Sequence, residues 1–134
     1  MYAVTVADAF IAQYYLTVPD AGPEGDPHSR EYGIELTFEG PELDEYGYLL
    51  DIDDAKAALE AIEERYADRL INDLPEFRNG NPSVERFARE IASRAAEAMD
   101  LDAVETVETL RVTLREDESA WAAYERSASG ESVE

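Results

Sequence analysis

The sequence offers few side chains that perform acid–base or nucleophilic chemistry near neutral pH. It contains no cysteine and a single histidine, His28. A thiolate nucleophile and a thiolate-ligated zinc or iron–sulfur cluster are therefore excluded. The groups that remain are carboxylates, phenols and arginines. One run of acids, Glu116, Asp117 and Glu118, ends an alternating apolar segment. The chemistry open to all these groups depends on the strands and helices that position them.

The charge of the chain excludes two classes of partner. Its 134 residues include 32 Asp and Glu against 11 Lys and Arg, a formal net charge of −21. This sign opposes contact with phosphates and anionic lipid head groups, so we expect no nucleic-acid and no membrane partner. All basic residues but Lys56 are arginines. The bias favours a halophilic, acidic surface adapted to high salt, and an ordinary acidic domain is the alternative.

The first 18 residues show no targeting segment. They contain Asp8 and alternate polar with apolar residues, without a basic leader region. No stretch of the sequence reaches the 18 consecutive apolar residues that a membrane span needs. We therefore expect a cytoplasmic protein.

Alternating polar and apolar residues predict the strands. Long strands are expected over residues 2–16 and 32–38, separated by a Pro- and Gly-rich loop at 19–27. A third strand is expected over 104–116 and a short fourth over 119–125.

Apolar residues spaced by three and four predict two helices between these strand pairs. The first begins after Asp51 as N-cap, and its apolar stripe extends to Leu70. For the second, Asn81 is the expected N-cap and Pro82 the first helical residue. Its buried stripe is expected to contain Val84, Phe87, Ile91, Ala95 and Ala98.

The order of these elements predicts an α+β fold, ββααββ, in which a four-stranded antiparallel sheet carries two helices on one face. Residues 2–126 form a single domain in this prediction, and 127–134 form a disordered tail. The outer strands of such a sheet expose unpaired backbone groups. Because a barrel closed by several subunits covers those edges, we expect a homo-oligomer.

Five short motifs follow the elements in order. They are residues 10–16 (FIAQYYL), 28–32 (HSREY), 47–56 (GYLLDIDDAK), 70–75 with 81–85 (LINDLP and NPSVE), and 115–117 (RED). Each is weak alone, but in this order the chain resembles the 6-pyruvoyl-tetrahydropterin synthase and 6-carboxytetrahydropterin synthase family. The resemblance covers about residues 2–126 and implies the tunnelling fold.

The resemblance implies a catalytic zinc held by three histidines. The corresponding positions here are Tyr14, His28 and Arg30. A guanidinium is protonated at every accessible pH and repels a metal cation. We therefore expect a degenerate metal site, with no metal and no cofactor.

The catalytic groups that the resemblance implies are replaced as well. Glu24 stands at the position of the family's catalytic cysteine, and the family's Asp–His pair falls at about Ala67 and Asp68. The zinc-dependent proton transfers of the family therefore cannot use the same groups in this chain.

The acid at the end of the third strand is the family feature that remains. The resemblance implies that Glu116 binds the amino-pyrimidine edge of a pterin, because a carboxylate accepts two parallel N–H bonds from such an edge. The alternative is that Glu116 belongs to a cluster of solvated acids. Asp117, which stands where the family has threonine, weakens the first interpretation because adjacent acids repel each other.

The three degenerate metal positions also have two interpretations. A cation and a phenol at this place can hold an anionic ligand such as a phosphate or carboxylate. Alternatively, Arg30 pairs with a nearby acid, Glu24, Asp26 or Glu31, and fills the vacated site. We favour the second interpretation.

Two further groups are expected to be structural. We interpret Trp121 and Tyr124 as packing residues of the last strand rather than a stacking platform. The acids on the first helix, such as Asp53 and Asp54, are expected to be solvated rather than metal-binding.

The sequence thus predicts a tetrahydropterin-synthase-like protein without the family's zinc and catalytic groups. It is expected to bind a pterin- or purine-like ring or to act as a self-assembling module. One alternative is an active lyase in which Glu24, Asp68 or Tyr14 replaces the missing acid and base groups. Another is a collapsed pocket in a protein whose oligomer alone matters.

The net charge of −21 predicts that folding and assembly depend on salt. Like charges repel one another over a screening length of about 8 Å at physiological ionic strength, and added salt shortens this length. The midpoint of thermal unfolding should rise by about 5–10 °C between low and molar salt. Calorimetry in sodium chloride and potassium chloride measures it. A midpoint that does not change with salt contradicts the prediction.

Overall fold

A computed structural model describes residues 1–78 and 80–130 of the chain. Its core is one four-stranded antiparallel sheet in the order β1-β2-β3-β4. The strands are β1 (Tyr2–Tyr14), β2 (His28–Gly40), β3 (Thr109–Arg115) and β4 (Trp121–Ser127). The predicted sheet is confirmed, and its strand order follows the order in the sequence.

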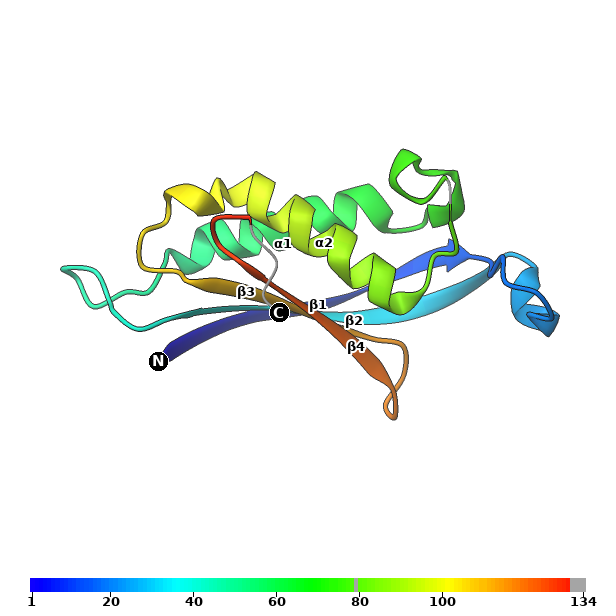
Figure 1. Cartoon of the computed structure of the whole chain (residues 1–134), viewed down its shortest axis with the longest axis horizontal. Helices are drawn as coiled ribbons and strands as arrows, with labels where there is room; N and C mark the ends of the chain where they lie inside the picture. Colours follow the sequence, from blue (N-terminus) through cyan, green and yellow to red (C-terminus); the bar gives the residue numbers. More distant parts are fainter. Residues whose placement is uncertain (79, 131–134) are drawn as a thin grey trace.

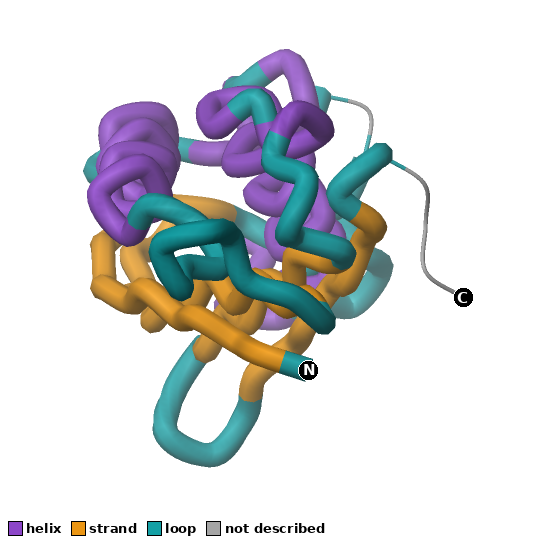
Figure 2. Tube along the Cα trace, turned by 90° about the vertical axis from the view of Figure 1, so that its left-hand side faces the viewer, coloured by secondary structure: helices purple, strands orange, loops and turns teal. Residues whose placement is uncertain are grey.

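Two helices, α1 (Ile52–Tyr66) and α2 (Val84–Met99), cover one face of this sheet (Figures 1 and 2). Helix α1 packs over β1, whereas α2 packs over β3 and β4. The predicted ββααββ arrangement with both helices on one face is therefore confirmed. Among the described residues, no helix is both long and apolar enough to span a lipid bilayer.

The β1–β2 hairpin is longer than the strands beside it. Its register runs from Tyr2 opposite Gly40 to Tyr14 opposite His28, whereas β3 pairs only with residues 33–39 of β2. One end of the hairpin thus projects past the end of β3, toward the loops that connect the two helices (Figure 1). Side chains at this end have no third strand beside them.

Non-local contacts shift the ends of the strands from their predicted positions. Strand β1 ends at Tyr14 rather than at residue 16, because the amide of Tyr15 donates to the Asn72 side chain at 2.9 Å. Strand β3 begins at Thr109 rather than at residue 104. The preceding residues form a 3-10 turn, Leu101–Ala103, and the amide of Val107 then bonds back to Val104.

The predicted start of α1 is confirmed, but that of α2 is wrong. Asp51 caps α1 by accepting from the amide of Asp53 at 2.9 Å. The N-cap of α2 is Ser83, which accepts from the amide of Arg86, and the helix begins at Val84. Asn81 cannot act as the cap because its side-chain oxygen is bonded to the amide of Thr17 at 2.8 Å.

Two expectations about individual helix residues are also wrong. The stripe of α1 ends with the helix at Tyr66, and Leu70 lies beyond it as a bridge partner of Gln13 on the edge of β1. On α2, Ala98 is exposed, and the buried stripe continues through Ala95 and Ala96 instead.

The last strand extends further than expected. Strand β4 ends at Ser127, and Ala128 is buried with its amide bonded to the carbonyl of Glu108. The described structure therefore continues past residue 126. Residues 131–134 of the expected tail lie outside the described residues.

Trp121, which was expected to be a packing residue of the last strand, lies on the face of the sheet that the helices leave uncovered. Trp121 is 53% exposed, and the Arg115 guanidinium lies 4.4 Å from the centre of its ring. Arg115 in turn pairs with Glu35 at 3.0 Å. Only Tyr124 packs against the core as predicted, because β4 directs Trp121 toward the face that no helix covers.

An aromatic cluster joins α2 to the projecting end of the hairpin. Phe87 of α2 is fully buried, and its ring lies 4.8 Å from Tyr66, 5.2 Å from Tyr32, 5.7 Å from Phe77 and 6.1 Å from Phe10. All four of these contacts of Phe87 have the edge-to-face geometry that aromatic pairs favour. The neighbouring rings of Phe10 and Tyr32 are tilted relative to each other. The cluster thus packs against the projecting end of the β1–β2 hairpin.

A buried carboxylate holds the loop between the helices. Glu76 accepts hydrogen bonds from Arg65 at 2.6 Å, Tyr66 at 2.8 Å and Arg94 at 2.9 Å, and its side chain is 8% exposed. Burial alone would raise the pKa of Glu76. The bonds from Arg65, from the backbone and from Tyr66, with the charge of Arg94, outweigh burial and lower the pKa to about 2.

Replacing this carboxylate should destabilise the fold. Glu76→Gln removes the charge that two arginines share, at a cost of about 1.5–3 kcal/mol in the free energy of unfolding. Because the folded state lowers the pKa from 4.5 to about 2, the stabilisation is complete above pH 4.5 and is lost as the pH falls through 2. Urea unfolding at pH 7 and pH 3 measures both effects.

The matched control is Glu64→Gln, since Glu64 is exposed on α1. Its effect should stay within about 0.5 kcal/mol. Equal effects of the two substitutions would show that Glu76 has no special role.

Candidate functional site

The projecting end of the hairpin brings the three degenerate metal positions together. Tyr14 pairs with His28 across the hairpin, and Ala12 pairs with Arg30. The rings of Tyr14 and His28 lie 4.2 Å apart, and Arg30 Nε donates to the Tyr14 hydroxyl at 2.9 Å. The sequence motifs thus identified side chains that form one contiguous group.

Tyr14 is buried in this group, with 3% of the residue exposed. Burial raises the pKa of its phenol, and the hydrogen bond and charge of Arg30 oppose this only in part. The phenol is therefore neutral at physiological pH and keeps its proton.

The imidazole of His28 is fixed in one tautomer by the backbone. Its Nδ1 lies 2.9 Å from the carbonyl oxygen of Asp26. A carbonyl can only accept, so Nδ1 carries a proton, and in the neutral ring the lone pair is on Nε2. Nε2 is buried, and no described residue bonds to it.

Of the three acids that the sequence offered as partners of Arg30, Glu24 is the one that pairs with it. Arg30 Nη2 lies 3.9 Å from Glu24 Oε1, which is an ion pair but longer than a hydrogen bond. Neither Asp26 nor Glu31 pairs with Arg30 within the described part of the chain. Glu24 itself is half exposed, so the attraction between the two charges is partly screened by solvent.

A cavity of about 240 Å³ opens beside this group. Tyr14 and Glu24 line it together with Glu116, the acid expected to bind a ligand. The remaining lining residues come from the loops, from β2 and from the start of α2: Leu16, Tyr32, Asn81, Pro82, Ser83, Val84 and Glu85. The structure therefore joins the degenerate metal positions and Glu116 in one place.

Glu116 reaches the cavity because it follows the last residue of β3. Arg115 pairs with Gly33, so Glu116 stands next to Tyr32 in register, on the face that the helices cover. Burial raises the pKa of Tyr32, and so does the charge of Glu116. No described residue donates a hydrogen bond to the Glu116 carboxylate.

The neighbouring acid has a different and structural role. Asp117 Oδ1 accepts from the amide of Ser119 at 2.7 Å, from its hydroxyl at 2.8 Å and from the amide of Ala120 at 3.0 Å. These bonds lower the pKa of Asp117 and form the turn between β3 and β4. The sequence contained the signal for this turn, an aspartate two residues before a serine.

The loops that line the cavity are tied to the end of β1. Asn72 exchanges two hydrogen bonds of 2.9 Å with the backbone of Tyr15, and Asn81 accepts from the amide of Thr17. Both asparagines belong to motifs that carry the resemblance, but the sequence analysis assigned no role to Asn72 and predicted Asn81 as a helix cap instead. Their side chains fix the wall that the loop before α2 contributes to the cavity.

Asp68 does not take part in this site. It is exposed, its φ is +60°, and its amide bonds to the carbonyl of Ile11 on the edge of β1. It is not among the residues that line the cavity. Of the three replacement groups considered above, the cavity therefore contains only Tyr14 and Glu24.

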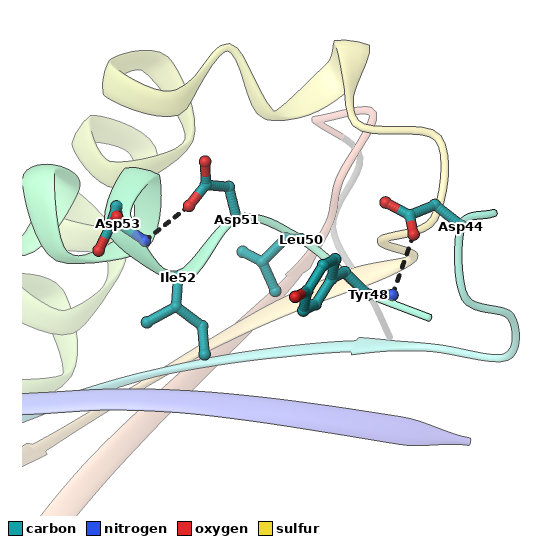
Figure 3. A pocket seen from close by; sticks show the side chains of 6 residues that line it. All are labelled: Asp44, Tyr48, Leu50, Asp51, Ile52 and Asp53. Atoms are coloured by element: carbon teal, nitrogen blue, oxygen red, sulfur yellow. Dashed lines mark hydrogen bonds between the residues drawn. The ribbon is translucent and has the colours of Figure 1, made fainter. Parts of the chain in front are cut away.

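A second cavity, of about 440 Å³, lies at the start of α1 (Figure 3). Three aspartates line it, but two of them serve local structure. Asp44 accepts from the amide of Tyr48 at 3.0 Å, and Asp51 caps α1 through Asp53. None of the expected site residues lines this cavity.

Comparison with known proteins agrees with this architecture. A sequence model described as 6-pyruvoyl tetrahydropterin synthase matches residues 3–127. The chain is similar in structure to the 6-pyruvoyl tetrahydropterin synthase of Caenorhabditis elegans, with a TM-score of 0.78 and 18% identity over 92% of this chain and 94% of that one. No curated protein matches the sequence significantly.

Two Plasmodium structures give the same result. The 6-pyruvoyl tetrahydropterin synthase of Plasmodium falciparum has a TM-score of 0.78 at 14% identity, covering 94% of this chain and 98% of that one. The protein of the same description from Plasmodium vivax has a TM-score of 0.75 at 15% identity, covering 95% and 99%. These likenesses show the tunnelling fold, and the match over residues 3–127 shows the family. The chain belongs to the 6-pyruvoyl tetrahydropterin synthase family.

Proposed function

We propose that the protein binds a pterin- or purine-like ring through Glu116 and does so without the zinc-dependent reaction of its family. The observation that carries the proposal is the state of the Glu116 carboxylate. It lines a cavity, is half-buried, and receives no hydrogen bond from a described residue. The adjacent Asp117 is committed to its turn, which leaves Glu116 available to a ligand edge with two N–H donors.

The residues present do not fit a zinc ion. Of the three positions, Arg30 offers only donors, and the Tyr14 oxygen already accepts from Arg30. His28 Nε2 is the one nitrogen at this place with a free lone pair. Among the described residues, no group of three or more His, Asp and Glu side chains converges as a metal requires.

An active lyase is the alternative, and one observation favours it. Tyr14 and Glu24 share the cavity with Glu116, so a phenol and a carboxylate could serve as acid and base near a bound ring. However, burial raises the pKa of Tyr14, which makes the phenol a poor base near neutral pH. Release of inorganic triphosphate from a dihydroneopterin-triphosphate-like substrate would support this alternative.

We also propose that the protein is a cytoplasmic homo-oligomer. The support for assembly is the sheet itself, whose outer strands are β1 and β4. At β1 only the end near Ile11 and Gln13 is covered, by the backbone of Asp68 and Arg69. Pairing of the remaining edges between subunits would close the sheets into a barrel.

Glu116→Gln should weaken binding of pterin or guanine and leave the oligomer intact. The amide keeps the shape of the side chain but offers one acceptor and adds a donor that the ligand edge cannot match. The loss of a charge-assisted bond, about 1.5–3 kcal/mol, corresponds to a ten- to hundredfold weaker Kd. Titration calorimetry in molar salt measures the affinity, and light scattering measures the assembly.

Asp117→Asn is the matched control, because asparagine retains the oxygen that forms the turn. It should change the affinity by less than about twofold. An equal loss in both variants would assign recognition to the wrong acid. If the unmodified protein binds neither pterin nor guanine, the binding proposal is wrong and the scaffold alternative remains.

The purified protein should contain no stoichiometric zinc, because Tyr14 and Arg30 replace two of the three expected ligands. Elemental analysis of protein grown with added zinc tests this directly. A ratio near one zinc per chain that survives dialysis would contradict the proposal.

A further inference from the structure

The hydroxyl of Tyr14 has a proton that the surrounding protein does not use. Its oxygen accepts the Nε–H of Arg30 at 2.9 Å. Because a guanidinium can only donate, the phenol must direct its own single proton elsewhere. No described residue accepts that proton, although Tyr14 is almost fully buried and lines the cavity.

This proton stays in place at physiological pH. Burial raises the pKa of Tyr14 above its ordinary value of 10.0. A hydroxyl that accepts a bond from a cation also becomes a stronger donor, because hydrogen bonds in a chain polarise one another. Arg30 thus holds the phenol in position and strengthens it as a donor.

Tyr14 and Glu116 approach the cavity from different directions. Their backbones belong to β1 and to the end of β3, two strand spacings or about 10 Å apart across the sheet. Along β2, Tyr14 stands beside His28 and Glu116 beside Tyr32, an offset of four residues or about 13 Å. Both residues nevertheless line the same cavity, so a ring whose donor edge lies on Glu116 has its opposite end free to extend toward Tyr14.

The charges around the cavity select the kind of group that Tyr14 can bind. Glu24, Glu85 and Glu116 line the cavity, and no arginine or lysine is among its described lining residues; Arg30 lies beside it, bonded to Tyr14 and paired with Glu24. An anionic group would be repelled by these acids. A neutral oxygen, in a hydroxyl or carbonyl group, meets no such penalty.

From this geometry we infer that Tyr14, positioned by Arg30, donates a hydrogen bond to a neutral oxygen at the end of the ligand opposite the Glu116-bound edge. The inference rests on the proposed function and specifies its ligand class: a two-ring amino-pyrimidine with an uncharged oxygen substituent. A phenol–guanidinium pair takes the position where the resemblance places metal ligands.

Two probes that differ by one oxygen test the inference. 6-Hydroxymethylpterin and 6-methylpterin share the edge for Glu116, and only the first carries the neutral oxygen. The unmodified protein should bind 6-hydroxymethylpterin about three- to tenfold more tightly, the ratio that one hydrogen bond to a neutral acceptor provides. Titration calorimetry in molar salt measures both affinities.

Tyr14→Phe should abolish this preference and leave the affinity for 6-methylpterin unchanged. Arg30→Gln should reduce the preference in the same way, since it removes the group that positions the phenol. Tyr46→Phe is the matched control, because Tyr46 is 77% exposed and lines neither cavity. It should retain the full preference.

Each other outcome overturns the inference in a recognisable way. Equal binding of both probes by the unmodified protein would reject the role of Tyr14 while the proposed function stands. Failure to bind either probe would reject the proposed function and the inference with it. If Tyr14→Phe weakens both probes equally, Tyr14 is structural. Should that variant not fold, the ratio of affinities in Arg30→Gln decides between the same outcomes.

Discussion

The carboxylate of Glu76 is the contact on which the candidate site depends. It binds Arg65 and Tyr66 at the end of α1 and Arg94 on α2, while its own carbonyl accepts from Arg86. The loop between the helices is thereby attached to both of them. That loop leads directly into the wall of the cavity before α2. A buried charge needs its donors in place, so Glu76 positions this loop together with the bonds of Asn72 and Asn81 to the chain after β1.

A guanidinium lies beside the cavity of a strongly acidic chain. The protein has a net charge of −21, yet its most buried titratable groups at the sheet end are the phenols of Tyr32 and Tyr14, with the partly buried guanidinium of Arg30 beside them. An arginine is retained there because Tyr14 and Glu24 compensate it on two sides. The surface acids are screened by salt, whereas this partly buried pair is screened much less. Ligand contacts inside the cavity are therefore less sensitive to salt than the surface is.

Local patterns in the sequence predicted the elements, and non-local contacts decided their ends. Alternation and helical periodicity predicted four strands, two helices and the cap at Asp51, because these depend on residues close in sequence. The cap at Asn81 was wrong because its side chain bonds to Thr17, 64 residues away. The motifs identified Tyr14, Arg30 and Glu116, but the bond between Tyr14 and Arg30 depends on the register of the hairpin. Composition alone contains no information about that register.

A zinc ion and the guanidinium of Arg30 are cations suited to different functions at the end of the hairpin. A zinc ion lowers the pKa of a bound water to about 7 and so makes proton removal possible at neutral pH. A phenol held by a guanidinium can donate a hydrogen bond, but it offers no empty orbital to a ligand oxygen. Burial keeps Tyr14 protonated, and Glu24 is half exposed and beside Arg30, so neither is suited to remove a proton from carbon. With Glu116 available as an acceptor and Tyr14 as a donor, the cavity has the groups needed to hold and orient a ring. The proposed function therefore assigns this cavity to holding and orienting a ring.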